Sequence, residues 1–549
     1  MSTNVSKEKR EKLLSEIEEI RKTLIEKHDD NTDRLLVYLS DIEKDINGKK
    51  YGLVFEEHRE AVDELLEKNV PVLVENEDLK IDNGGTQNFL IEGDNLASLK
   101  LLEKTHKGKI DLIYIDPPYN TGNKDFVYDD AFVDSEDKFK HSKWLSFMSE
   151  RLKIAHRLLS DKGVIFISID NNEQAQLKIL CDNVFNDNNY IGTMIWRKKA
   201  GGGQTDEFFV TEHEYILCYR KAFAFKWLNF QEEAKIEDFK LKDNYGNYTL
   251  VKLEKWGSSA HKEDRPSMYF SIKAPDKSDY FPKAPDGKDG RWRVGLQKMT
   301  EIIKQNNIYW SFDKKKNSWI PYEKVYFNEL KGKLIKSRSI IYDLAETGDA
   351  TKQLTEVFGT KDLFQNPKPV ELIQFLIKHC NCSIVLDFFA GSGTTGHAVM
   401  KLNAEDGGKR KFILCTNNEN NICRDVTYER IKRVIAKEDY KASLKYYKVD
   451  FVPISEQLYY EYADKLLLHI KELVELENGL DFAGNNKVAI CLTDDELKTF
   501  ADSINGETAY KAVYVGHDVF VTPETEDKLT SHNVNINVIP DYYYGELRG

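Results

Sequence analysis

The sequence predicts an α/β protein in which a parallel sheet carries helices on both faces. Three observations lead to this class. Short apolar strands alternate with amphipathic helices from residue 86 onward, one apolar strand ends at two consecutive prolines, and another runs directly into a glycine-rich turn. Strands that alternate with helices are typical of parallel sheets, because a parallel connection needs a crossover segment. The 549 residues are enough for several domains.

The alternation occurs in two blocks. In the first block we predict strands over 88–94, 109–119 and 162–170, and helices over 96–108, 141–160 and 173–185. Segments 191–199 and 212–221 follow without a helix between them, which indicates an antiparallel pair at one edge of the sheet. The second block has a helix over 370–380, a strand and glycine turn within 383–399, a strand over 409–419 and a helix over 426–437.

We therefore expect one α/β domain that is split by an insert. The predicted boundaries are a helical N-terminal region over 1–85, the two halves of the α/β domain over 86–221 and 361–449, the insert over 222–360, and a small C-terminal α/β domain over 450–549. The N-terminal helices are a candidate dimer contact, with packing on their own domain as the alternative. The acidic C-terminal domain is a candidate partner-binding surface, with plain solubility as the alternative.

Composition excludes several classes of protein. Hydrophobic residues make up 41% and charged residues 31% of the chain, which argues against disorder and against a membrane protein. The N-terminal residues lack the apolar core of a secretion signal, so we expect a cytoplasmic protein. The seven cysteines contain no C-x-x-C pair, and we expect reduced thiols and no metal site. The net charge is −13, but residues 221–360 are basic between acidic ends, and a polyanion responds to local charge.

The strand over 109–119 ends in Asp116-Pro117-Pro118-Tyr119. The prolines restrict the backbone, and ligands of open α/β sheets bind beyond the carboxyl ends of the strands. Asp116 and the Pro117 carbonyl can each accept a hydrogen bond from an exocyclic amine, and Tyr119 can stack on its ring. The tetrapeptide thus predicts a site for a planar amine, with an ordinary strand-ending turn as the alternative.

The glycine turn follows the strand that ends at Asp387. Its candidate ligand-binding residues are Asp387, Phe388, Ala390, Gly391, Ser392, Gly393, Thr394 and Thr395. The glycines let the backbone approach a ligand, and the helix N-terminus presents free N–H groups. Asp387 would repel a pyrophosphate and suits an ammonium group. The alternatives are a close strand–helix crossing and the dinucleotide fingerprint that Gly396 nominally completes.

Two other strand ends carry polar candidates. Glu419 ends the strand over 409–419, where a carboxylate can hold ribose hydroxyls, with a solvated turn as the alternative. Asp94 ends the strand over 88–94, Asn95 follows it, and both are candidates for holding an adenine amino group. The competing interpretation of Asp94 or Asn95 is a helix N-cap.

The insert combines basic and aromatic side chains. Such side chains suit phosphate contacts and base stacking, although any single cluster is more often a solvated face. The candidates for nucleic-acid binding are Lys255, Arg265, Arg291, Arg293, Lys314 and Lys315.

Together these motifs resemble the S-adenosylmethionine-dependent amino-methyltransferases of DNA. In that family D-P-P-Y is the catalytic motif and D-F-F-A-G-S-G-T-T the cofactor motif. The catalytic motif comes first here, with the insert between the two, and this order resembles the β class. The strings GDNL, IYIDPPYNTG and VLDFFAGSGTTGHAV resemble the modification subunit of type III restriction systems, over roughly residues 50–450.

The resemblance implies a Rossmann-like methyltransferase with circularly permuted motif order, whose insert is a target-recognition domain. It implies that Asp116, Pro117, Pro118 and Tyr119 hold a flipped adenine in double-stranded DNA, which becomes N6-methyladenine. Lys368 and Pro369 match the family's cofactor-flanking element. The resemblance also implies a homodimer and a helicase-nuclease restriction subunit as partner.

Several alternatives stay open at this point. The substrate could be N4 of cytosine, or RNA, and the site could belong to an NAD-dependent oxidoreductase or to a catalytically dead assembly subunit. Asp481 and the triplet Glu496-Leu497-Lys498 faintly resemble a nuclease motif, which would make the chain a methyltransferase fused to a nuclease. A Walker A sequence is absent, so DNA translocation would require a partner.

Overall fold

The computed structural model divides the chain into two compact units. It describes residues 5–26, 32–47, 55–122, 127–128, 131–132, 139–201, 208–232, 239–314, 317–327, 333–361, 363–454, 460–483, 485–506 and 509–548. One unit comprises residues 1–228 and 338–549, and the other comprises Asn229–Ser337. The second unit lies within the expected insert of 222–360, whose flanking residues belong to the first unit. Within the described ranges, no helix is both long and apolar enough to cross a membrane.

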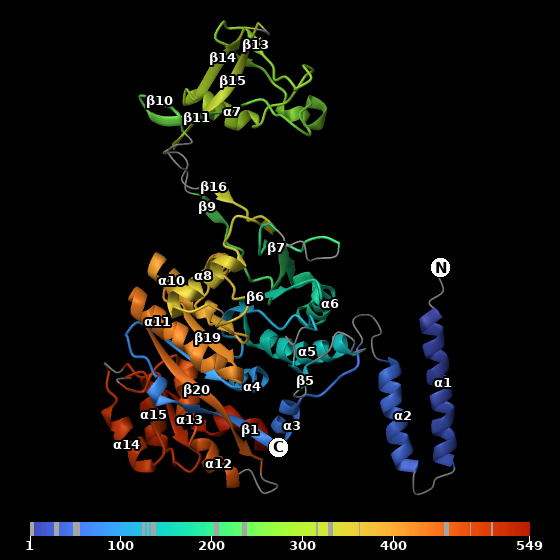
Figure 1. Cartoon of the computed structure of the whole chain (residues 1–549), viewed down its shortest axis with the longest axis vertical. Coiled ribbons are helices and arrows are strands. Elements are labelled where there is room, and N and C mark those ends of the chain that lie inside the picture. Colours follow the sequence, from blue (N-terminus) through green and yellow to red (C-terminus); the bar gives the residue numbers. More distant parts are fainter. Residues whose placement is uncertain are drawn as a thin grey trace. The chain divides into compact units, whose positions relative to one another are not determined.

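The first unit is built on a ten-stranded sheet (Figure 1). In sheet order the strands are β1 (Asn69–Glu75), β20 (Ala442–Pro453), β2 (Thr86–Glu92), β19 (Lys411–Thr416), β18 (Ile384–Asp387), β3 (Ile110–Ile115), β6 (Leu159–Ile169), β8 (His213–Arg220), β7 (Tyr190–Arg197) and β17 (Ile340–Ile341). The strands from β20 to β6 run parallel to their neighbours. The expected antiparallel pair is β7 with β8, and the two-residue β17 adds a further strand beside β7.

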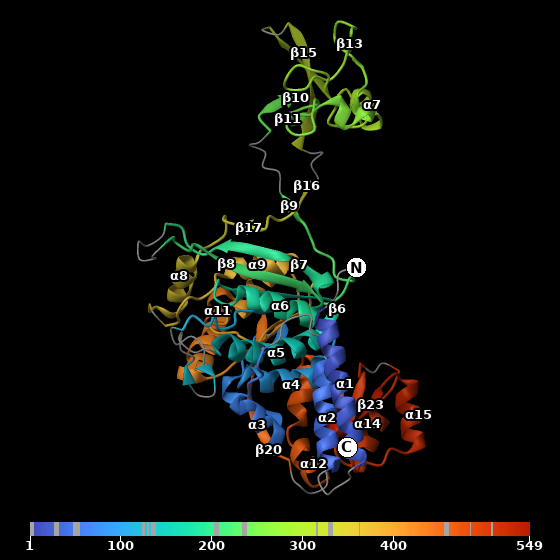
Figure 2. The same cartoon turned by 90° about the vertical axis from the view of Figure 1, so that its right-hand side faces the viewer.

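Helices cover both faces of this sheet, as predicted (Figure 2). The first face carries α4 (Asn95–His106), α5 (Lys140–Leu158) and α6 (Gln174–Phe185), and the second carries α9 (Val370–Lys378), α10 (Thr394–Asp406) and α11 (Glu429–Glu438). Successive residues of a strand point to opposite faces. Accordingly Ile113 and Ile115 of β3 join the core of the first face, whereas Leu112 and Tyr114 join the core of the second.

The order of the strands reverses between β18 and β3. These strands are hydrogen-bonded neighbours, with Leu386 opposite Ile113. The chain leaves β18 toward β19 and leaves β3 toward β6, so their connections run in opposite directions. Ligands of open α/β sheets bind in the crevice at such a switch point. Asp387 ends β18 and Asp116 follows β3, so both residues lie at the carboxyl ends of these two neighbouring strands.

The two ends of the chain add to the same unit. The N-terminal region forms α1 (Val5–Glu26), α2 (Thr32–Asn47) and α3 (Ala61–Lys68), but it is not helical throughout, because β1 forms the sheet edge beside β20. At the other end, β20 spans the expected boundary at residue 450. Further along are α12 (Tyr460–Leu467), α13 (Ile470–Asn478), α16 (Asp541–Tyr544), and the parallel strands β21 (Val488–Cys491), β22 (Ala512–Gly516) and β23 (Asn535–Ile539) with α14 (Asp494–Ser503) and α15 (Pro523–Ser531).

The second unit has its own sheet and its own small core. The sheet is antiparallel, in the order β10 (Leu241–Asp243), β11 (Gly246–Lys252), β15 (Ser318–Tyr326) and β14 (Ile308–Asp313). Its core contains Leu253, Ile272, Trp292, and Met299 and Ile302 of α7 (Leu296–Lys304). The second unit also contains two short strand pairs, β12 (Ile272–Lys273) with β13 (Asp279–Tyr280) and β9 (Phe230–Glu232) with β16 (Lys333–Ile335). The first unit contains the short pair β4 (Val127–Tyr128) with β5 (Ala131–Phe132), and the helix α8 (Thr347–Phe358).

Candidate active site

Side chains of α5 and of Glu173, which precedes α6, form hydrogen bonds that hold the loop after β3. Trp144 of α5 donates its indole N–H to the Pro118 carbonyl at 2.7 Å. Asn120, whose φ is +58°, donates its amide to the Glu173 carboxylate, and His141 contacts the same carboxylate at 2.7 Å. Among the described residues nothing donates a hydrogen bond to the Pro117 carbonyl. Its acceptor positions are therefore unused within the described part of the chain, in a residue that is itself buried.

Asp116 and Tyr119 lie in a cluster with Lys368 and Glu214. The Lys368 ammonium lies 2.8 and 2.7 Å from the two carboxylate oxygens of Asp116 and 2.9 Å from the Tyr119 hydroxyl. It also lies 3.4 Å from the Glu214 carboxylate. The Tyr119 hydroxyl is 2.7 Å from Asp116 and 3.1 Å from Glu214. The side chain of Lys368, expected beside the cofactor, therefore reaches the D-P-P-Y loop.

Glu214, near the start of β8, was missed by sequence reasoning. Nothing in EHEYILCYRK distinguishes this position from an exposed polar residue of an edge strand. In the structure its side chain is only 8% exposed, and Lys198 contacts it at 3.0 Å. Only the pairing of β8 with β6 brings this carboxylate into the site.

Burial and neighbouring charges shape the ionisation of the cluster. Burial raises the pKa of Asp116, and Lys368 opposes that rise. Burial alone would also raise the pKa of Glu214, but Lys368 and Lys198 outweigh it, so this pKa is lowered. Burial would lower the pKa of Lys368, but Asp116 and Glu214 raise it instead. Lys368 is consequently charged at neutral pH.

The glycine turn joins β18 to α10. Gly391 and Gly393 have φ values of +47° and +74°, a region that favours glycine. Asp387 is 2% exposed and accepts hydrogen bonds from the Thr395 hydroxyl at 2.5 Å and the Phe389 N–H at 3.0 Å. No cationic side chain of the described residues pairs with it, and burial raises its pKa to about 7. A buried carboxyl without a cation suits a positively charged ligand group.

Arg430 of α11 supports the turn and was also missed. Its buried guanidinium donates to the Thr394 hydroxyl at 2.7 Å and to the Ser392 hydroxyl at 3.1 Å. The hydroxyls of Ser392 and Thr394 therefore stabilise the turn, and Thr394 also donates to the Lys368 carbonyl at 3.1 Å. A cation within an ordinary amphipathic helix gives no sign of this role in the sequence.

Three other predicted cofactor residues have buried side chains. The side chains of Phe388 and Ala390 belong to the apolar cores, and Pro369 immediately precedes α9. These side chains therefore pack within the protein, and only their peptide groups can face a ligand.

The polar residues at the ends of β2 and β19 differ in their roles. Asp94 accepts from the Leu96 N–H at 2.7 Å, so it is a helix N-cap, which was the competing interpretation. Asn95 donates to the Phe388 carbonyl at 3.2 Å and thereby joins β2 to the glycine turn. Glu419 is exposed, and its side chain has no hydrogen bond or ion pair within the described part of the chain. Its carboxylate is accessible to a ligand.

The basic residues of the second unit that were predicted to bind DNA differ in solvent exposure. Arg265 and Lys314 are exposed, Lys255 is half-buried, and Lys315 lies outside the described residues. Arg293 is exposed and pairs with Glu323. Arg291 is 6% exposed and donates to the Ser259 carbonyl at 2.6 Å. The expectation that Arg291 binds DNA is therefore wrong, because its guanidinium is buried and holds a loop.

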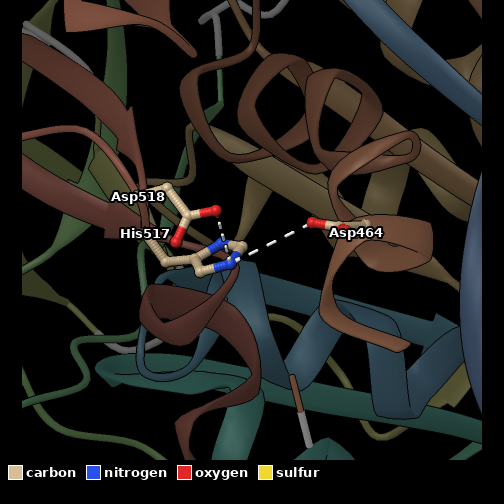
Figure 3. Close-up of side chains that lie close together, drawn as sticks. All are labelled: Asp464, His517 and Asp518. Carbon is tan, nitrogen blue, oxygen red and sulfur yellow. Dashed lines mark ion pairs between the residues drawn. The ribbon is translucent and has the colours of Figure 1, made fainter. Parts of the chain in front are cut away.

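The described residues contain one group of side chains spaced for a metal ion: Asp464, His517 and Asp518, with ligand atoms within 4.8 Å of one another. Figure 3 shows Asp464 on α12 facing His517, which follows β22. His517 lies 4.0 Å from Asp464 and 3.4 Å from Asp518, and both aspartates are largely exposed. These contacts are those of a surface ion-pair cluster.

The residues of the nuclease alternative have structural roles. Asp481 pairs with Lys80 and, at 3.2 Å, with Lys445. The Glu496 carboxylate accepts from the Leu492 N–H at 2.7 Å at the start of α14. The residues of this motif therefore do not assemble into a metal-binding group within the described part of the chain.

Comparisons with known proteins give a consistent result. A family model described as DNA methylase, of the N6/N4 type, matches residues 110–428. The chain is 33% identical to the type III restriction-modification enzyme StyLTI Mod subunit of Salmonella typhimurium, over 68% of this chain and 61% of that one. It is 35% identical to the type II methyltransferase M.KpnI of Klebsiella pneumoniae, over 61% and 81%. It is 35% identical to the EcoPI Mod subunit of Escherichia phage P1, over 62% and 58%. The chain thus spans about three fifths of the length of these two Mod relatives.

Proposed function

Because this chain belongs to the N6/N4 DNA methylase family, we propose that it transfers a methyl group from S-adenosylmethionine to N6 of an adenine in double-stranded DNA. The observation that carries the proposal is the rigid loop in which the Asp116 carboxylate and the free Pro117 carbonyl lie at the switch point of the sheet. Asp116 stands where related cytosine enzymes often have Ser, and this favours adenine over cytosine.

The target base must leave the duplex to reach this loop. Asp116 and the Pro117 carbonyl would accept the two amine hydrogens, which fixes the plane of the amine and directs the nitrogen lone pair. Tyr119 would stack on the base, with its hydroxyl anchored by Asp116 and Lys368. A strong base is unnecessary, because the nitrogen attacks first and loses its proton afterwards.

The residues at the neighbouring strand end suit the methyl donor. Asp387 is a buried carboxyl without a cationic partner among the described residues, and it would hold a cationic amino group. The N–H groups at the start of α10 would bind a carboxylate, and Glu419 would bind ribose hydroxyls. S-adenosylmethionine, when bound, supplies an electrophilic methyl group on a positively charged sulfur.

We further propose that the chain is the modification and recognition component of a restriction-modification system. The names of its Mod relatives support this assignment. The second unit would contact DNA through Arg265 and Lys314, which are exposed, and through Trp256, which is 53% exposed. A homodimer and a separate restriction subunit belong to the same proposal.

The test is methyl transfer from labelled S-adenosylmethionine to unmethylated genomic DNA, with the product nucleosides identified by mass spectrometry. The wild type is compared with Asp116→Ala and with Asp161→Ala, which removes an exposed carboxylate on β6. We expect N6-methyladenine with the wild type and the control, and none with Asp116→Ala. Labelled cytosine would overturn the choice of base, and an absence of label in DNA with the wild type would overturn DNA as the substrate.

A further inference from the structure

Lys368 connects the two motifs of the site. Its backbone carbonyl accepts a hydrogen bond from Thr394 of the glycine turn at 3.1 Å. Its side chain reaches the other motif, where the ammonium contacts both carboxylate oxygens of Asp116. The side chain is only 8% exposed, whereas that of Asp116 is 27% exposed. The cation is therefore enclosed, and the carboxylate that it holds is partly exposed.

The cluster is balanced in charge. Asp116 and Glu214 contribute two negative charges, and Lys368 and Lys198 contribute two positive ones. Removing a buried charge would leave its partner uncompensated, which is costly in a site screened from water. Lys368 is the cation shared by both carboxylates, so its loss would affect the ionisation of both Asp116 and Glu214.

An ionised Asp116 has a limited number of acceptor positions. A carboxylate offers about four lone-pair sites. Lys368 occupies one on each oxygen, and the Tyr119 hydroxyl lies within hydrogen-bonding distance of one oxygen. One acceptor position then remains for an incoming amine. The Glu214 carboxylate, 3.4 Å from the same ammonium, offers Lys368 a second partner.

We propose that Lys368 and Glu214 are positioning residues of the target-base pocket: Lys368 keeps Asp116 ionised and oriented toward the amine, and Glu214 holds Lys368 in place. A protonated Asp116 would carry a hydrogen where the amine must donate one, so the pocket works only with the carboxylate. This inference rests on the proposed function and adds two residues that act on the target base through Asp116.

Other ionisable groups also face the pair. Burial and nearby carboxylates raise the pKa of Tyr119 and that of Tyr114 well above the ordinary value, so both remain protonated. Within the described part of the chain, Asp387, Asp170 and Lys198 also interact electrostatically with Asp116 or Glu214. All of these are unchanged by substitution of Lys368, so the effect on Asp116 comes from losing the shared cation.

The test is the pH dependence of kcat/KM for methylation of DNA, because this ratio reports the ionisation of the free enzyme. In Lys368→Gln the Asp116 carboxylate loses its cation. We therefore expect the acidic limb of the profile, where kcat/KM falls as Asp116 takes up a proton, to move to a pH that is higher by about one unit or more. Glu214→Gln keeps an oxygen that can accept a hydrogen bond from Lys368 but removes the like charge beside Asp116, so Lys368 stays in place and the limb should move downward. In the double variant the two effects oppose each other, so its limb should lie between those of the single variants.

Two further variants separate positioning from folding. Lys378→Gln removes a lysine on α9 that pairs with Glu405 at 3.3 Å on the surface, and it should leave the limb unchanged. Lys368→Arg keeps the charge and should keep the acidic limb of the wild type even if kcat falls. Circular dichroism checks that each variant is folded, and Glu214→Gln carries the test if Lys368→Gln does not fold.

The outcomes distinguish this inference from the proposed function. A wild type that methylates DNA, together with single variants whose acidic limbs coincide with that of the wild type, would refute the positioning role and leave the proposed function intact. A wild type that transfers no methyl group to DNA at any pH would refute the proposed function and the inference with it.

Discussion

Replacing Asp387 with Asn should stabilise the ligand-free protein above neutral pH and at the same time weaken its binding of the methyl donor. The reason is that Asp387 is buried, with a Thr hydroxyl and one N–H as its hydrogen-bond donors and no cation among the described residues. Burial raises its pKa from the ordinary value of 3.8 to about 7. The folded protein therefore holds a proton that the unfolded chain releases between these two values.

The size and sign of the effect follow from this difference. Stability falls as the pH rises from about 4 to about 7, because the folded state then binds more protons than the unfolded state, and it levels off above. Each pH unit is worth about 1.4 kcal/mol, so ionised Asp387 lowers the free energy of unfolding by up to about 4 kcal/mol at pH 8. Asn carries no ionisable proton and avoids this loss.

The assay is urea unfolding of the wild type and Asp387→Asn at pH 5 and pH 8, together with calorimetric titration of S-adenosylmethionine. We expect the stability advantage of the variant to be larger at pH 8, and its affinity for the methyl donor to be at least tenfold lower. Asp406→Asn, at the end of α10, is the control of opposite sign, because Arg410 lowers the pKa of Asp406 and the loss of this carboxylate should destabilise the protein at pH 8. A stability difference that is the same at both pH values would refute the reasoning for Asp387.

Three further predictions concern the turn and the second unit. Arg430→Met removes the cation that holds Ser392 and Thr394. It should lower the free energy of unfolding by about 3 kcal/mol in urea titrations, because buried hydrogen-bonding groups lose their partner. An unchanged midpoint of urea unfolding would contradict this role. Gly393→Ala places a Cβ at a φ of +74° and 3.2 Å from Thr427, so it should cost about 1–2 kcal/mol by the same measurement and weaken methyl-donor binding in calorimetry. The double variant Arg265→Ala with Lys314→Ala should reduce the slope of log K against log salt for DNA binding by about 1.8, as expected if both residues contact phosphates, whereas a wild-type slope would exclude such contacts.

Much of the architecture could be predicted because it depends on local patterns. The alternation of strands and helices is visible in the apolar periodicity, and the glycines and prolines mark the two loops directly. The antiparallel β7–β8 pair was recognisable because no helix separates the two segments. The edge strand β1 was not, because it continues from α3 and its pairing partner β20 lies more than 360 residues away in the chain.

The sequence by itself determined which residue types stand at the ends of the central strands, and therefore the chemistry that those ends can perform. Only the tertiary structure decided which side chains meet there. The ammonium of Lys368 lies against Asp116 rather than within the cofactor turn, Glu214 arrives from β8, and Arg291 is buried. The physical reason is that a sequence motif reflects the local backbone conformation. The direction of a long side chain depends instead on packing and charge partners contributed by distant strands and helices.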